Sequence, residues 1–245
     1  MARKKKSVES KESWDPKKWV QPPSIPYERI EELPEWKVGE IVGGELHVSP
    51  RPLFGHCLGN YVLGGKLMEP FQYGNGGPGG WWFVPEPELH LGRDIVIPDL
   101  AGWRRERMPV FPARIPFHTL APDWICEVLS PSTEKLDREK KMKIYEREYV
   151  SYLWLLDPIK RTLETFRLEG SKWRTLETYC GDAIIRAEPF EAIEIDLLNI
   201  WGETRKAAPN STVTPRPPAH AQKTSAAPGP RPFAQRTRAP SRKTR

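Results

Sequence analysis

Cysteine is scarce in this sequence of 245 residues, and its three copies are Cys57, Cys126 and Cys180. They are odd in number, widely spaced and include no Cys-x-x-Cys pair, so neither a disulfide framework nor a thiolate zinc site is expected. Long apolar runs are lacking too, because the longest, at 152–156, is far shorter than the roughly 20 residues that span a bilayer. We therefore expect a cytoplasmic protein without a membrane anchor.

Acidic residues are absent from the segment 204–245, where ten Lys or Arg stand among Pro, Ala, Ser and Thr. Such a composition cannot offset the entropy of ordering, so we predict a disordered basic tail. The segment 1–20 has seven basic residues, three acidic ones and no apolar run, which predicts a flexible basic segment and not a signal peptide. Between them, 21–203 is long enough for one core, and we predict a single domain there.

The basic character of the chain belongs to its two ends. The formal net charge is +6, but without the two end segments 21 basic and 29 acidic residues remain. Flexible basic segments favour non-specific attraction to a polyanion such as nucleic acid, an attraction that weakens steeply as salt rises. A tail that only improves solubility explains the same composition equally well.

Strand and helix patterns alternate through the predicted domain and indicate an α/β or α+β fold, with a mixed central sheet flanked by helices. Helices are expected at 27–33, 53–68 and about 133–149, with a short one ending near Trp201. Two strands are expected within 36–49, around the turn Gly43-Gly44. Further strands are expected at 81–84, 88–91, 94–103, 123–129, 152–156, 162–168, 172–178, 183–185 and 192–195.

Two acidic residues stand where their neighbours predict burial. Asp99 follows Pro98 in the expected strand 94–103, and Glu127 lies inside the apolar run 123–129. An unpaired buried charge costs several kcal/mol, so such a carboxylate is normally protonated, paired or bound to a metal. Neighbouring strands could set both within reach of one ion, and hard oxygen ligands suit Mg²⁺ or Mn²⁺. Such an ion can activate water for phosphodiester hydrolysis.

These acids belong to a longer pattern that resembles the Uma-type restriction endonuclease family of the PD-(D/E)XK nuclease superfamily. The resemblance extends over roughly 27–201, and its most specific part is the run from Glu127 to Pro158. The early part of the resemblance consists of Gly44-Glu45-Leu46 with Ser49-Pro50, and then Pro98-Asp99. The specific part begins with Glu127-Val128-Leu129-Ser130-Pro131-Ser132-Thr133. It continues with Asp137, Lys141 and Tyr145 at steps of four and ends with Tyr152-Leu153-Trp154-Leu155-Leu156-Asp157-Pro158.

The resemblance implies a restriction-endonuclease-like fold and a metal-dependent endonuclease that acts on DNA, with Asp99 and Glu127 as metal ligands. The usual lysine of the superfamily, two places after the acid, would fall on Leu129, which cannot serve. The resemblance to the Uma-type family instead suggests Lys141, from the following helix, as the electrostatic and water-orienting group. It also suggests Glu45 as a further acid on the metal side.

Other interpretations of the same residues stay open. Asp137 and Lys141 could be a surface pair on one helix face, and Tyr145 could simply pack that helix on the sheet. His56, near the start of the glycine-rich helix, could touch the site. After the Asp99 strand, Arg104, Arg105 and Arg107 could grip phosphates, although a solvated charge cluster explains them equally well.

Two further functions compete with the endonuclease. A nucleic-acid-binding protein that keeps the fold without turnover is favoured by Leu129 at the usual lysine position. A metal-dependent hydrolase or partner-binding module unrelated to nucleic acid is supported only by the acidic core. Nucleases that cut both strands are often dimers, so a homodimer is compatible with the sequence, but no residue pattern demonstrates an interface.

Overall fold

The structure is a computed structural model that describes Pro23 and residues 25–206. The predicted basic segment 1–20, and the predicted tail apart from 204–206, lie outside the described residues. No helix in the described part is long and apolar enough to cross a membrane.

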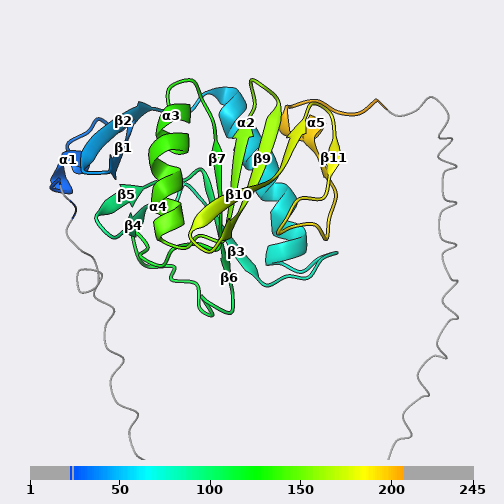
Figure 1. Cartoon of the computed structure of the whole chain (residues 1–245), viewed down its shortest axis with the longest axis horizontal. Helices are drawn as coiled ribbons and strands as arrows, with labels where there is room; N and C mark the ends of the chain where they lie inside the picture. Colours follow the sequence, from blue (N-terminus) through cyan, green and yellow to red (C-terminus); the bar gives the residue numbers. More distant parts are fainter. Residues whose placement is uncertain (1–22, 24, 207–245) are drawn as a thin grey trace, which may run out of the picture. The chain divides into compact units, whose positions relative to one another are not determined.

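A six-stranded mixed sheet forms the centre of the fold (Figure 1). Its order is β10-β9-β8-β7-β6-β3, in which β7 and β8 are parallel and the other neighbours antiparallel. The parallel pair is joined by one long helix, as a crossover connection requires. The strands are β3 (Trp81–Pro85), β6 (Leu100–Arg104), β7 (Trp124–Val128), β8 (Tyr152–Asp157), β9 (Thr162–Glu169) and β10 (Lys172–Cys180).

A second, antiparallel sheet has the order β2-β1-β5-β4, and a two-stranded sheet pairs β11 with β12. These strands are β1 (Lys37–Val42), β2 (Glu45–Pro50), β4 (Leu89–Leu91), β5 (Asp94–Val96), β11 (Ile184–Ile185) and β12 (Ile195–Asp196). The helices are α1 (Glu28–Glu31), α2 (Phe54–Leu67) with its π-helical extension η2 (Met68–Gln72), and α5 (Leu197–Ile200). Between β7 and β8, one continuous helix consists of α3 (Glu134–Leu136), η3 (Asp137–Lys141) and α4 (Met142–Arg147). The predicted mixed α+β fold is thus confirmed.

The predicted strand 94–103 is wrong in one respect, because it is two strands in two different sheets. β5 pairs with β1 and β4, whereas β6 pairs with β3 and β7. The break falls at 97–99, where Pro98 has no N–H to give to a ladder. The N–H groups of Ile97 and Asp99 donate instead to the carboxylates of Glu40, at 2.8 Å, and Glu127, at 3.4 Å.

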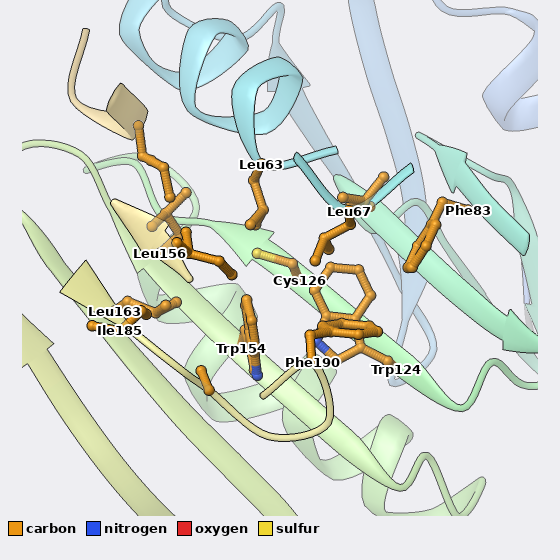
Figure 2. Packing of buried hydrophobic residues seen from close by; sticks show 14 of the residues in the cluster. Leu63, Leu67, Phe83, Trp124, Cys126, Trp154, Leu156, Leu163, Ile185 and Phe190 are labelled. Atoms are coloured by element: carbon orange, nitrogen blue, oxygen red, sulfur yellow. The ribbon is translucent and has the colours of Figure 1, made fainter. Parts of the chain in front are cut away.

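Apolar side chains cover both faces of the six-stranded sheet. In β7 successive side chains alternate between these two faces. Trp124, Cys126 and Val128 pack against the buried flank of α2, as Figure 2 shows for Leu63 and Leu67. Ile125 lies on the opposite face, in the cluster that contains Ile144, Tyr145, Leu153 and Leu155. Glu127 shares this second face, so it points toward the α3–η3–α4 helix.

Trp154→Ala is expected to lower the free energy of unfolding by about 3–5 kcal/mol. Trp154 is fully buried, and its ring lies 5.3 Å from Trp124 and 5.6 Å from Phe190 (Figure 2). Urea unfolding followed by circular dichroism measures the loss. Trp36→Ala is the control, because that side chain is exposed and its removal should change the free energy by less than about 0.5 kcal/mol. Equal losses in both variants would contradict this account of the core.

Candidate active site

The break between β5 and β6 places Asp99 beside β7. Asp99 Oδ2 accepts a hydrogen bond of 2.7 Å from the N–H of Val128, and the N–H of Asp99 donates to Glu127 Oε2 at 3.4 Å. From α2, the side-chain amide of Asn60 donates to the Asp99 carbonyl at 2.9 Å. Contacts from two elements, β7 and α2, therefore hold Asp99 next to Glu127.

Glu127 is buried, and its Oε1 atom receives two donors from the helix above the sheet. Lys141 Nζ lies 2.8 Å from Oε1, and the Tyr145 hydroxyl donates to the same atom at 2.5 Å. Oε1 is therefore engaged with the helix, while Oε2 is the oxygen on the side of Asp99. A cation and a hydroxyl group therefore compensate the free-energy cost of burying this carboxylate.

Lys141 is the centre of a buried cluster of carboxylates. Besides Glu127, its Nζ atom lies 3.1 Å from Glu40 Oε1 and 3.5 Å from Asp137 Oδ1. It also donates to the Ile97 carbonyl at 3.4 Å. Asp137 and Lys141 are the first and last residues of η3, and single π-helical turns within α-helices are frequent at functional sites.

Burial controls the protonation of this cluster. It raises the pKa of Glu127 well above its usual range, with Lys141 opposing the shift and the other acids adding to it. Burial likewise raises the pKa of Asp137 to about 6. For Lys141 burial acts to lower the pKa, but Glu127 and Glu40 outweigh it and raise that pKa well above its usual value. The ammonium group therefore stays charged, and Glu127 and Asp137 bind protons more readily than exposed acids do.

These groups form the floor of a cleft of about 320 Å³. Its walls come from the end of β2 and the start of α2 on one side and from 130–133 on the other. His56, from α2, also lines it, with Nε2 at 2.6 Å from Asp99 Oδ1. Its Nδ1 atom is buried and has no hydrogen-bond partner among the described residues. Four carboxylates, those of Glu40, Asp99, Glu127 and Asp137, face the cleft beside Lys141 and His56.

The residues that build this cleft lie within a stretch, 26–198, that matches the model of the Uma2 family, described as "Putative restriction endonuclease". This chain belongs to the Uma2 family. No curated protein matches it. Among solved structures, it is similar to a "putative nuclease belonging to DUF820" from Anabaena variabilis, with a TM-score of 0.56 and 19% identity. That similarity covers 71% of this chain and 96% of the other, and it shows a shared fold.

In this Uma2 protein the structure brings together Asp99, Glu127 and Lys141, but not Glu45. Glu45 begins β2 beside the hairpin turn, its side chain is 67% exposed, and it pairs with Lys140 at 2.6 Å. Glu40, on β1, takes the place expected for it. The reason is the sheet order: β1 is the inner strand, next to β5 and the Asp99 segment, whereas β2 is the outer one.

Sequence reasoning missed Glu40 and understated Asp137. Glu40 lies within Val38-Gly39-Glu40-Ile41-Val42, so the argument that singled out Glu127, an acid among apolar strand residues, could have found it. The alternative of a surface pair is wrong for Asp137, because this residue is buried beside Lys141. Tyr145 packs the helix on the sheet and also contacts Glu127, and His56 does touch the site.

The three arginines expected to grip phosphates lie at the end of β6 farthest from Asp99. Arg105 lies 3.8 Å over the Trp82 ring and donates to the Gln72 carbonyl at 2.8 Å. Arg104 stacks over Trp81, and Arg107 pairs with Asp123 at 2.9 Å. Their guanidinium groups contact the protein itself, so the structure does not place them at the cleft of this Uma2 protein.

Proposed function

We propose that this Uma2 protein is a divalent-metal-dependent endonuclease that hydrolyses phosphodiester bonds in DNA, with Asp99 and Glu127 as metal ligands. The observation that carries the proposal is the convergence of Asp99, Glu127 and Lys141 at the floor of one cleft. Family membership supports a nuclease, and the cleft supplies the groups that such chemistry needs.

The donor set fits a hard divalent cation. Four carboxylates against one lysine leave an excess of negative charge at the floor of the cleft. Within the described residues, no group of three or more His, Cys, Asp and Glu side chains has the geometry to hold a metal alone. Two carboxylates are enough for Mg²⁺, because it keeps several waters and takes further oxygens from a substrate phosphate. Mn²⁺ favours similar oxygen ligands.

When bound, the ion would polarise the phosphoryl oxygen and lower the pKa of an attacking water. The protein groups around it have distinct tasks. Lys141 and Tyr145 hold Glu127 Oε1, which keeps Oε2 turned toward Asp99. Glu40 and Asp137 hold the Lys141 ammonium at the cleft floor, where its charge can stabilise a negatively charged transition state.

The leucine at position 129 is not an argument for a protein that only binds nucleic acid. Leu129 is buried in the apolar cluster on the helix side of the sheet. Lys141 brings an ammonium group to within 2.8 Å of Glu127 from the helix that follows. The charge that the superfamily takes from the strand is therefore available from the helix, and turnover is the better-supported function.

The purified full chain, incubated with supercoiled and linear DNA, tests the proposal directly. We expect cleavage in the presence of Mg²⁺ or Mn²⁺ and none in excess chelator. Binding without cleavage under either metal would favour the non-catalytic alternative. The absence of any binding or cleavage would contradict a function on DNA altogether.

Metal binding is expected to weaken in acid because protons and the ion compete for the same carboxylates. Burial raises the pKa of Asp137 to about 6 and raises the pKa of Glu127 as well, so both groups hold protons at a higher pH than exposed acids do. We expect Mg²⁺ affinity to be at least about tenfold lower near pH 5 than near pH 8, with proton release on binding near pH 6 to 7. Calorimetry in two buffers of different ionisation enthalpy measures both. An affinity independent of pH would show that these acids do not take part.

A further inference from the structure

One face of α2 is apolar and exposed. At about 100° per residue, Phe54, Cys57 and Tyr61 fall on one side of this helix, opposite the buried Gly59, Leu63 and Leu67. The exposed fraction is 91% for Phe54 and 81% for Tyr61. Neither side chain therefore stabilises the core of the described part. Two large aromatic side chains exposed one above the other on one helix face are available to a ligand.

This face adjoins the cleft. Leu53, which caps the start of α2, and His56, in its first turn, both line the cleft, and Asn60 contacts Asp99. Leu53 immediately precedes Phe54. A strand that places a phosphate at Asp99 and Glu127 and continues along α2 would therefore pass over Phe54 and then Tyr61.

The charge of this surface suits a polyanion. The segment 53–67 contains no Asp or Glu, although acids outnumber bases in the chain between its two end segments. Arg51 precedes the helix and lines the cleft. The phosphates of a strand that leaves the cleft along this face would meet the Arg51 guanidinium and no carboxylate from the helix itself.

We propose that Phe54 and Tyr61 are a stacking surface for unpaired bases, so that the substrate is single-stranded DNA or a locally unpaired stretch. The inference rests on the proposed nuclease function and names its substrate class. Aromatic rings stack on any base, but in a duplex the faces of the bases are already covered by their neighbours. Seven residues of helix place the two backbone positions about 10 Å apart along the helix axis, a length that a few stacked bases span.

A second copy of the chain is a less well supported partner for this face. A stable interface needs about 800 Å² from each partner. Two aromatic side chains supply about 300–500 Å² when buried. The absence of acidic groups and the direct continuity with the cleft favour a nucleic-acid strand.

Fluorescence anisotropy with a labelled single strand and a blunt duplex of equal length tests the inference. All proteins carry Glu127→Gln, which prevents cleavage during the titration. We expect Phe54→Ala and Tyr61→Ala each to weaken single-strand binding by about 5- to 100-fold. Duplex binding should change by less than about twofold, because its bases offer no free face. Phe54→Tyr should retain affinity, whereas Phe54→Leu, apolar but not aromatic, should not.

Tyr149→Ala is the matched control, because Tyr149 is equally an exposed tyrosine but follows the far end of α4. It should bind the single strand like its parent. Unchanged single-strand binding by Phe54→Ala would overturn the inference, while metal-dependent cleavage by the wild type would leave the proposed function standing. A shift from dimer to monomer in sedimentation caused by Phe54→Ala would assign the face to a second copy instead. Failure of the wild type to bind or cleave any DNA would overturn both.

Discussion

Glu127→Gln is expected to reduce metal-dependent DNA cleavage by about 10²–10³-fold or more, a loss typical of removing one group that stabilises transition-state charge. Glutamine keeps the shape of the side chain and can still accept from Tyr145, but it removes the negative charge from between Asp99 and Lys141. A neutral amide is a poor ligand for a hard dication. Initial cleavage rates on supercoiled plasmid at saturating Mg²⁺ measure the effect.

Glu45→Gln is the matched control for this loss. The resemblance to the Uma-type family suggests Glu45 as part of the site, whereas the structure pairs it with Lys140 on an exposed edge strand. We expect its cleavage rate to stay within about twofold of wild type, in keeping with the small energies of surface pairs. Full cleavage by Glu127→Gln would disprove the proposed site. A large loss of cleavage in Glu45→Gln would show that Glu45 belongs to the site.

Lys141→Met is expected to lower the free energy of unfolding by about 3–5 kcal/mol near neutral pH and to abolish cleavage. Methionine fills similar space but leaves the carboxyls of Glu127, Glu40 and Asp137 without their shared cation. The loss should shrink as pH falls below about 6, because Asp137, whose pKa is raised to about 6, then becomes neutral, and the raised pKa of Glu127 acts in the same direction. Urea unfolding at several pH values measures the trend.

Lys140→Met is the control for Lys141→Met. Lys140 is the neighbouring residue, but its side chain is partly exposed, and solvent screens its pair with the exposed Glu45, so the loss of that pair should change stability little. Mg²⁺ should restore part of the stability that Lys141→Met loses, because the ion brings positive charge to the same carboxylates. Equal, pH-independent losses in both variants would show that Lys141 is not the centre of the cluster.

Much of the fold follows from local patterns in the sequence. Alternation and turn residues predicted the hairpins 37–50 and 162–180, and helical spacing predicted α2 and the helix that carries Lys141. These predictions succeeded because each depends on neighbours a few residues apart. The break at 97–99 was missed because two sheets compete for one continuous stretch, a choice made by β1 and β7 and not by the stretch itself.

The sequence by itself determined which acids have to be compensated: one inside the apolar strand 124–128 and one after Pro98. For Lys141 it left a surface position open. Only the tertiary structure decided how they are compensated. Lys141 meets Glu40, and not Glu45, because β1 is the strand that pairs with β5, and sheet order depends on pairings between segments more than 50 residues apart. A buried charge requires a partner, but which of several acids comes within about 3 Å is a matter of long-range register.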